Sequence, residues 1–175
     1  MIDYLGEILS EGLYSRTKLR TEKMGNYTFT DKRRYDGKTS RISVSVSYPN
    51  WQMFYNKRME FKSKGWALLA LDPRILWELN CWFLPKNAAS KSLTKNIELS
   101  SWIKFNEMFE GPNRLSSIPE NWTTDAQAEV MIKDEIPPKY IKNIIVETAY
   151  DKYLCEDKCK SKIEVIINKK LFGRR

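Results

Sequence analysis

Residues 124–132 read Thr-Asp-Ala-Gln-Ala-Glu-Val-Met-Ile and carry the chain from a polar loop into an apolar run typical of a β-strand. The residues before them, 111–126, contain two prolines and several Ser, Thr and Asn residues, which favour turns. The segment therefore predicts a strand over residues 128–132 with a carboxylate, Glu129, close to its start. A glutamate in this place is also compatible with a solubility role, because charged residues are ordinary at strand edges.

Other segments have the patterns of strands. Residues 42–48 alternate polar and apolar side chains without interruption, which predicts a strand with one buried face. Residues 66–71 are continuously apolar, which favours a central strand. Further strands are expected at residues 81–83, 140–146 (after a turn of helix) and 162–168.

Helices are expected where apolar residues recur every three or four positions. Leu5, Ile8 and Leu9 have this spacing, and Gly12 follows as a stop signal. Further helical segments are expected at residues 51–58, 72–77 and 102–109, with Phe54 and Tyr55 as core residues. Residues 16–38 are polar and basic and are expected to form a surface loop. The whole pattern predicts one α+β domain, residues 1–175, with a mostly antiparallel sheet.

The composition excludes several kinds of site. The sequence contains no histidine, which rules out a Ser-His-Asp triad, a Cys-His pair and a histidine-ligated metal. Three cysteines do not form a fully paired framework and fall short of a four-ligand zinc site, so no metal is expected. No run has the length of a membrane span and no signal peptide is recognised, so we expect a cytoplasmic protein without membrane association.

The charge balance is basic. The formal net charge is +8 and the sequence pI is about 9.3. Together with 13% aromatic residues, this favours a polyanionic partner such as nucleic acid, although solubility alone also explains a charge of this size.

Several blocks of sequence share their order with one known family. These blocks are Asp3–Leu13, the pair Arg33-Arg34, residues 45–55, Asn87-Ala88-Ala89, and Gln127-Ala128-Glu129 followed by Ile136-Pro137 and Ile141. In this order they resemble the DarT family of nucleic-acid ADP-ribosyltransferases, the toxins of bacterial toxin–antitoxin pairs. The resemblance covers nearly the whole chain.

The resemblance implies an ADP-ribosyltransferase-like fold, a mostly antiparallel split β-sheet with flanking helices, and NAD as a co-substrate without a metal. It implies that Glu129 is the catalytic glutamate and Arg34 the second functional residue, with Arg33 competing for that role. The residues implied to contact NAD are Leu13, Arg33, Ser45, Ser47 and Tyr48. The residues implied to contact the substrate are Arg114, Trp122 and Gln127. The implied partners are single-stranded DNA or RNA and a cognate antitoxin protein, in a toxin–antitoxin or phage-defence system.

The chemistry of the reaction suits these roles. Departure of nicotinamide leaves positive charge on the ribose, which a fixed carboxylate stabilises selectively in the transition state. The same carboxylate can remove a proton from an attacking base nitrogen. An arginine supplies bidentate contacts to a diphosphate that lysine does not reproduce.

One feature departs from the family. Its members usually carry a His-x-Thr-type motif on a strand just before the first helix, and this sequence has no histidine. The departure leaves three alternatives: a different mode of NAD binding, a start of the given sequence after that strand, or a weak or inactive relative. Two competing functions also stay open: a non-catalytic nucleic-acid-binding relative, and a transferase that modifies proteins.

Overall fold

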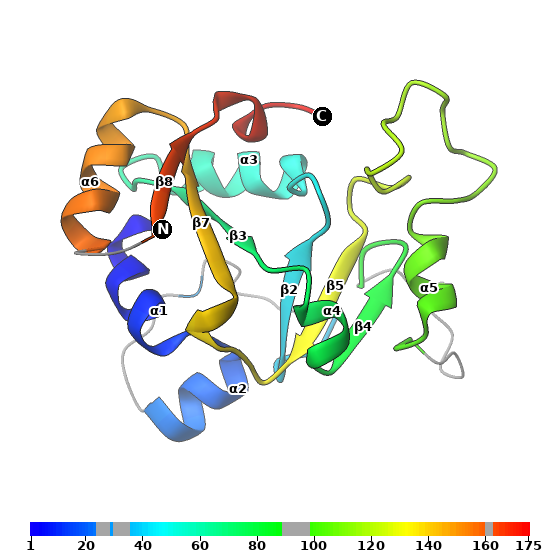
Figure 1. Ribbon diagram of the computed structural model, residues 1–175, viewed down its shortest axis with the longest axis horizontal. Coiled ribbons are helices and arrows are strands. Elements are labelled where there is room, and N and C mark those ends of the chain that lie inside the picture. Colours follow the sequence, from blue (N-terminus) through cyan, green and yellow to red (C-terminus); the bar gives the residue numbers. More distant parts are fainter. Residues whose placement is uncertain (24–28, 30–35, 89–98, 160–162) are drawn as a thin grey trace. The chain divides into compact units, whose positions relative to one another are not determined.

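The computed structural model describes residues 1–23, 29, 36–88, 99–159 and 163–175 (Figure 1). The chain divides into two compact units, each assembled from segments that are far apart in the sequence. The first unit comprises Met1–Leu13, Trp51–Ile75 and Ile136–Arg175. The second unit comprises Tyr14–Asn50 and Leu76–Glu135.

The sheet of the first unit contains, among the described residues, the strands β3 (Ala67–Leu71), β7 (Ile141–Val146) and β8 (Glu164–Ile167). The central strand β7 is antiparallel to β3 and parallel to β8 (Figure 1). Residues 66–71 were expected to form a central strand, but β3 lies at an edge of the described sheet and its residues are half-buried. A parallel pair requires a crossover connection, and helix α6 (Ala149–Cys159) lies in the segment that joins β7 to β8. The expected mostly antiparallel arrangement is therefore correct for this sheet except at its β8 edge.

The helical segments of the first unit are short. Besides α6, the described ones are η1 (Ile2–Tyr4), α1 (Leu5–Glu11), α3 (Trp51–Glu60), η3 (Pro138–Tyr140) and η4 (Lys169–Phe172). Helix α4 (Ile75–Glu78) begins at Ile75, the last residue of the segment Trp51–Ile75. The core of the unit consists of small and aliphatic side chains from α1, α6 and the sheet: Ile2, Leu5, Ile144, Val146, Cys155, Cys159 and Val165. Burial raises the pKa of the Cys155 thiol to about 11.

Helix α1 ends at Gly12 for a steric reason. Gly12 has a φ of 101°, and a Cβ there would lie 2.5 Å from the carbonyl oxygen of Ile136. Glycine is the residue that adopts this conformation without strain, so the stop signal in the sequence corresponds to a real backbone requirement.

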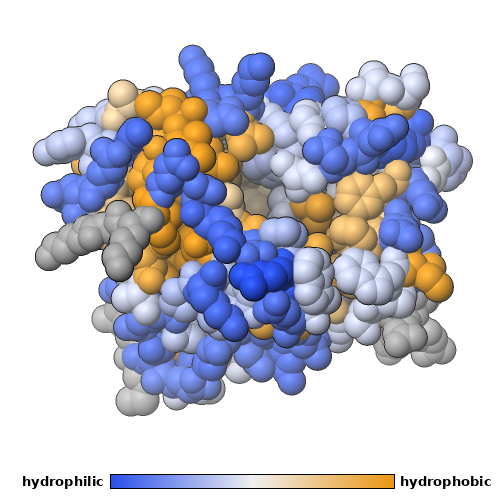
Figure 2. Space-filling model, in the orientation of Figure 1, coloured by the Kyte–Doolittle hydropathy of each residue, from blue (hydrophilic) through white to orange (hydrophobic). Residues whose placement is uncertain are grey.

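Apolar surface on the first unit gathers over β7 and β8. Figure 2 shows hydrophobic side chains over this region, bordered by hydrophilic ones. Ile166 is 37% exposed and Ile167 is 47% exposed, because β8 is an edge strand.

The second unit is built around an antiparallel sheet. Its strands, among the described residues, are β2 (Arg41–Ser45), β5 (Glu129–Lys133) and β4 (Cys81–Leu84), with β5 in the centre. Helix α5 (Trp102–Glu107) packs by its aromatic face on β4, since the Phe105 ring lies 5.3 Å from that of Phe83. The Cys81 thiol is buried, which raises its pKa to about 11. Elsewhere, β1 (Leu13–Tyr14) and β6 (Glu135–Ile136) pair in a two-stranded sheet.

The strand expected over residues 42–48 is present but ends at Ser45. Ser47 has a φ of 60°, in the left-handed region, and this breaks the extended backbone. The alternating pattern therefore predicts the strand correctly and its end incorrectly.

The prediction of a surface loop over residues 16–38 is wrong at its start. Helix α2 (Arg16–Lys18) continues there into a π-helical segment, η2 (Leu19–Lys23). The Ser15 hydroxyl caps α2 by accepting a hydrogen bond from the Lys18 backbone N–H at 3.2 Å. This local capping stabilises a helix in a segment whose apolar periodicity is weak.

Tyr55 was expected to be a core residue, and this prediction is wrong. Its neighbour Phe54 packs 5.4 Å from the ring of Phe172, as expected for a core residue. Tyr55 instead is 52% exposed, because successive helical residues point about 100° apart and only one of the pair faces the core.

Within the part of the chain that the structure describes, no helix combines the length and apolarity needed to cross a membrane.

Candidate active site

Glu129 is the first residue of the central strand of the second unit. Its Cα partners are Ser45 on β2 and Leu84 on β4. Side chains alternate along a strand, so Glu129 lies on the face opposite to Val130, which is fully buried. The Glu129 side chain itself is half-buried.

Two donors hold the Glu129 carboxylate. The backbone N–H of Ala88, just after β4, donates to Oε1 at 2.6 Å. The Ser43 hydroxyl, from β2, donates to Oε2. Each carboxylate oxygen thus has its own partner, and this arrangement fixes the plane of the carboxylate.

The loop before β5 is shaped by Asp125. Its Oδ1 accepts a hydrogen bond from the Gln127 N–H at 2.8 Å, and its carbonyl oxygen accepts from the Ala128 N–H at 3.1 Å. This is the turn that an Asx side chain typically stabilises, and it directs the chain into the strand. Asn87 then donates to Gln127 Oε1 at 3.4 Å.

These contacts define a polar group at one end of the sheet that we call the Glu129 cluster. Its members are Ser43, Asn87, Ala88, Gln127 and Glu129. The structure therefore brings two sequence-predicted site residues, Glu129 and Gln127, into one cluster. Sequence reasoning missed Ser43 as a site residue, although it shares the alternation of Ser45 and Ser47.

The other predicted residues of β2 and its following turn have different surroundings. Ser45 is exposed and accepts a hydrogen bond from the Asn50 N–H at 3.0 Å, and Ser47 is also exposed. Tyr48 is buried against Trp122, with ring centroids 4.5 Å apart, and burial raises the pKa of its hydroxyl. Their predicted contacts with NAD stay predictions.

Arg114 stabilises the loop that precedes Glu129 by hydrogen bonds. Its guanidinium donates to the carbonyl oxygens of Trp122 at 2.9 Å and Pro119 at 2.8 Å, and to the Thr124 hydroxyl at 3.2 Å. These bonds engage both terminal nitrogens of the guanidinium within the loop. The predicted role of Arg114 in substrate contact stays a prediction, and so does that of Trp122.

Three further site residues were predicted from the family resemblance. Arg33 and Arg34 fall outside the described residues. Leu13 is half-buried in β1, in the first unit. Over the described ranges, no three or more Cys, Asp or Glu side chains come together in a way that would hold a metal ion.

A family model described as "ssDNA thymidine ADP-ribosyltransferase, DarT" matches residues 1–172. The chain belongs to the DarT family. This membership confirms the prediction of an ADP-ribosyltransferase, and the α+β fold with its antiparallel sheets agrees with it. No curated protein sequence matches the chain significantly.

Solved structures of DarT proteins share the fold. Thermosipho africanus DarTG in complex with ADP-ribose matches with a TM-score of 0.64 at 17% identity, over 98% of this chain and 49% of that one. Thermus sp. 2.9 DarT in complex with NAD+ matches with a TM-score of 0.60 at 14% identity, over 98% of this chain and 93% of that one. The same protein in complex with ADP-ribosylated ssDNA matches with a TM-score of 0.64 at 14% identity, over 98% and 92% of the two chains. This chain thus spans about half the length of the DarTG chain.

Proposed function

We propose that this protein transfers ADP-ribose from NAD to the base of thymidine in single-stranded DNA, with Glu129 as the catalytic carboxylate. The observation that carries the proposal is the Glu129 carboxylate, held by Ser43 and Ala88 at the start of a central strand in a chain of the DarT family. The DarT protein from Thermus sp. 2.9 has been solved with NAD+ and with ADP-ribosylated ssDNA, which supports both substrates.

Glu129 performs two tasks in the proposed reaction. The bond between the ribose C1′ and nicotinamide breaks, nicotinamide leaves with the bonding electron pair, and positive charge develops on the ribose. The carboxylate stabilises that charge where it appears. It also accepts the proton of the thymine ring N–H as that nitrogen bonds to C1′.

Single-stranded DNA fits this chemistry better than a duplex. The ring N–H of thymine lies on the edge that pairs with adenine, so a paired base must first be removed from the stack. We assign Gln127 to the edge of the base, because its amide has both a donor and an acceptor and lies in the Glu129 cluster. Trp122 is assigned to stacking and Arg114 to the neighbouring phosphate.

We assign the binding of NAD to the residues that the family resemblance implies as its contacts. Ser45 and Ser47 are exposed and carry hydroxyls suited to an amide or a ribose. The resemblance also assigns Tyr48 and Leu13 to NAD, and it assigns Arg33 and Arg34, which supply charge, to the diphosphate. No histidine of this sequence makes the ribose contact of the usual family motif, because the sequence contains none.

We further propose that the protein is the toxin of a toxin–antitoxin pair that acts in the cytoplasm in phage defence. The DarTG match and the family resemblance support a cognate antitoxin protein as its partner. Expression of the wild-type chain alone is expected to stop bacterial growth, and Glu129→Gln is expected to relieve this. Equal growth of both strains at matched protein levels would contradict the proposal.

The biochemical test uses protein made by cell-free synthesis, so that toxicity does not select against it. Labelled NAD is offered separately with thymidine-containing single-stranded DNA, the same DNA as a duplex, RNA and a protein mixture. We expect label on the single-stranded DNA, and a loss of about 10²–10³-fold in rate for Glu129→Gln. The matched control is Glu164→Gln, which changes the first residue of another strand, β8, and should leave the rate unchanged.

The alternatives give different results. Label on protein or RNA alone would favour those acceptors over DNA. No label on any acceptor, with DNA binding retained, would indicate a non-catalytic nucleic-acid-binding relative.

A further inference from the structure

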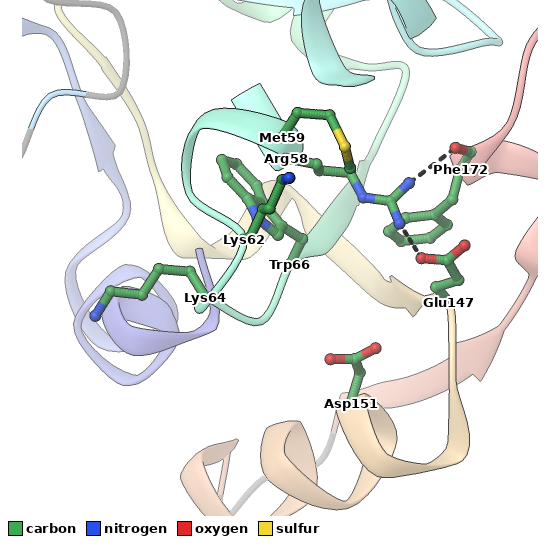
Figure 3. Close-up of a pocket in the computed structure, with 8 residues that line it drawn as sticks. All are labelled: Arg58, Met59, Lys62, Lys64, Trp66, Glu147, Asp151 and Phe172. Atoms are coloured by element: carbon green, nitrogen blue, oxygen red, sulfur yellow. Dashed lines mark hydrogen bonds and ion pairs between the residues drawn. The ribbon is translucent and has the colours of Figure 1, made fainter. Parts of the chain in front are cut away.

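Two adjoining cavities lie on the first unit, at the side of α3 that faces η4. One has a volume of about 220 Å³ and is shown in Figure 3, and the other has a volume of about 400 Å³. Four residues line both cavities: Arg58, Met59, Glu147 and Phe172. Because their walls are shared, we describe the two cavities together as the aromatic groove.

The floor of the aromatic groove is built in advance of any ligand. The Phe54 ring contacts Trp66 with centroids 5.7 Å apart and Phe172 with centroids 5.4 Å apart. Arg58 donates to the carbonyl oxygen of Phe172 at 2.9 Å and forms an ion pair with Glu147 (Figure 3). These contacts hold the floor in one arrangement, which reduces the entropy lost on binding.

Large apolar side chains line the open side of the groove. Trp51, Tyr55 and Met59 are spaced by four residues along α3 and so lie on one face of the helix. Tyr55 is 52% exposed and Met59 is 41% exposed. Exposed aromatic rings in a groove offer stacking surfaces that a base of any sequence can use.

Cations accompany these rings. The Arg174 guanidinium lies 5.4 Å from the ring centroid of Trp51, and Lys62 lines the first cavity. In the part of the chain that the structure describes, neither Lys62 nor Arg174 has a carboxylate within ion-pair distance. The last seven residues, 169–175, contain four basic residues and no acidic one.

Two ion pairs account for part of the charge around the groove. Glu147 is paired with Arg58, and Lys64 is paired with Asp3 at 2.7 Å. Asp151 accepts a hydrogen bond from the Thr148 hydroxyl at 2.7 Å. Among the lining side chains outside these two ion pairs, Lys62 and Arg174 outnumber Asp151, so the remaining charge is positive, which favours a polyanion.

We propose that the aromatic groove is a second binding surface for single-stranded DNA. Bases stack on Trp51 and Tyr55, and Arg174 and Lys62 contact the phosphates. The proposal extends the proposed function, because a transferase acting on one base gains affinity by holding other nucleotides of the strand.

The test measures binding without chemistry. Fluorescein-labelled oligo(dA) of about 20 nucleotides contains no thymidine, and its binding to the purified full chain is followed by fluorescence anisotropy in the absence of NAD. The groove variant is Tyr55→Ala with Arg174→Ala. The control variant is Tyr153→Ala with Lys152→Ala, which removes the same kinds of side chain from α6, outside the groove.

We expect the groove variant to bind oligo(dA) about tenfold more weakly than the wild type. The dependence of log K on log salt should become less steep by about 0.7, the value for one lost phosphate contact on a single strand. The control variant should bind as the wild type does. The assay contains neither NAD nor thymidine, so a failure of the proposed transfer reaction would leave this binding result unaffected, and the two proposals can fail separately.

Two results would overturn the proposal. The first is wild-type affinity for oligo(dA) in the groove variant, which would leave a protein partner as the better explanation of the exposed aromatic residues. The second is an equal loss of affinity in the groove and control variants, which would show that only net charge matters.

Discussion

Removal of the Ser43 hydroxyl tests how the carboxylate of Glu129 is held. In Ser43→Ala, Oε2 loses its hydroxyl donor, whereas the Ala88 N–H still holds Oε1 at 2.6 Å. A hydrogen bond to a charged group contributes about 1.5–3 kcal/mol. Ser43 is exposed, so water can replace part of that contribution. The lower end of the range applies, and it corresponds to a loss of about tenfold in kcat.

The assay is initial-rate transfer of labelled ADP-ribose to thymidine-containing single-stranded DNA, with kcat and KM measured separately. A positioning role predicts that kcat falls while the KM for NAD changes little. Ser43→Thr should restore most of the rate, because it keeps the hydroxyl and its branched side chain suits a strand. Ser40→Ala, one residue before β2, is the control and should behave as the wild type does.

The double variant Ser43→Ala with Glu129→Gln supplies the decisive comparison. If Ser43 acts through the carboxylate, its removal should cost little once the carboxylate is gone. A tenfold loss in both backgrounds would refute the positioning role. So would a wild-type kcat in Ser43→Ala.

Two further predictions concern stability. Gly12→Ala should destabilise the protein by about 2 kcal/mol or more, because the new Cβ would combine left-handed backbone strain with a backbone oxygen 2.5 Å away. The control is Gly37→Ala, where φ is also positive but no atom lies within 4 Å, and the Tm of Gly12→Ala should be the lower of the two. Equal Tm values would contradict the steric argument. Hydrogen bonds and ion pairs from Arg74 and Lys142 hold the pKa of Asp72 well below its usual value of 3.8. The stability that these contacts provide is therefore present above pH 3.8 and is lost as the pH falls below 3.8. Asp72→Asn should therefore unfold at lower urea concentrations than the wild type at pH 7, with a gap that narrows below about pH 4; a gap that is constant with pH would contradict this.

Much of the fold follows from local patterns in the sequence. The uninterrupted alternation that starts at Ile42 predicts β2, and the apolar run that ends at Leu71 predicts the existence of β3. The run does not predict the place of β3, because the order of strands in a sheet is set by distant parts of the chain. Helix α6 was not predicted. It buries Cys155 and Cys159 while it exposes Tyr150 and Tyr153, so its apolar face is small and its periodicity weak.

The candidate site was predicted in part, because only some of its residues stand in a recognisable local pattern. Glu129 is visible in the sequence, because a carboxylate at the start of an apolar strand stands out. The role of Ser43 depends on the register between β2 and β5, which pairs Ser45 with Glu129, and no local pattern contains that information. The donor from Ala88 is a backbone group, and residue types say nothing about it.

The three buried cysteines give each unit a chemical probe of its own opening. Cys81 lies in the second unit, whereas Cys155 and Cys159 lie in the first. With thiol pKa values of about 11 for Cys81 and Cys155, very little reactive thiolate exists at neutral pH, and the side chains are shielded from solvent. Pulsed alkylation followed by peptide mapping would therefore time the unfolding of one unit against the other in the natural sequence, without any introduced label.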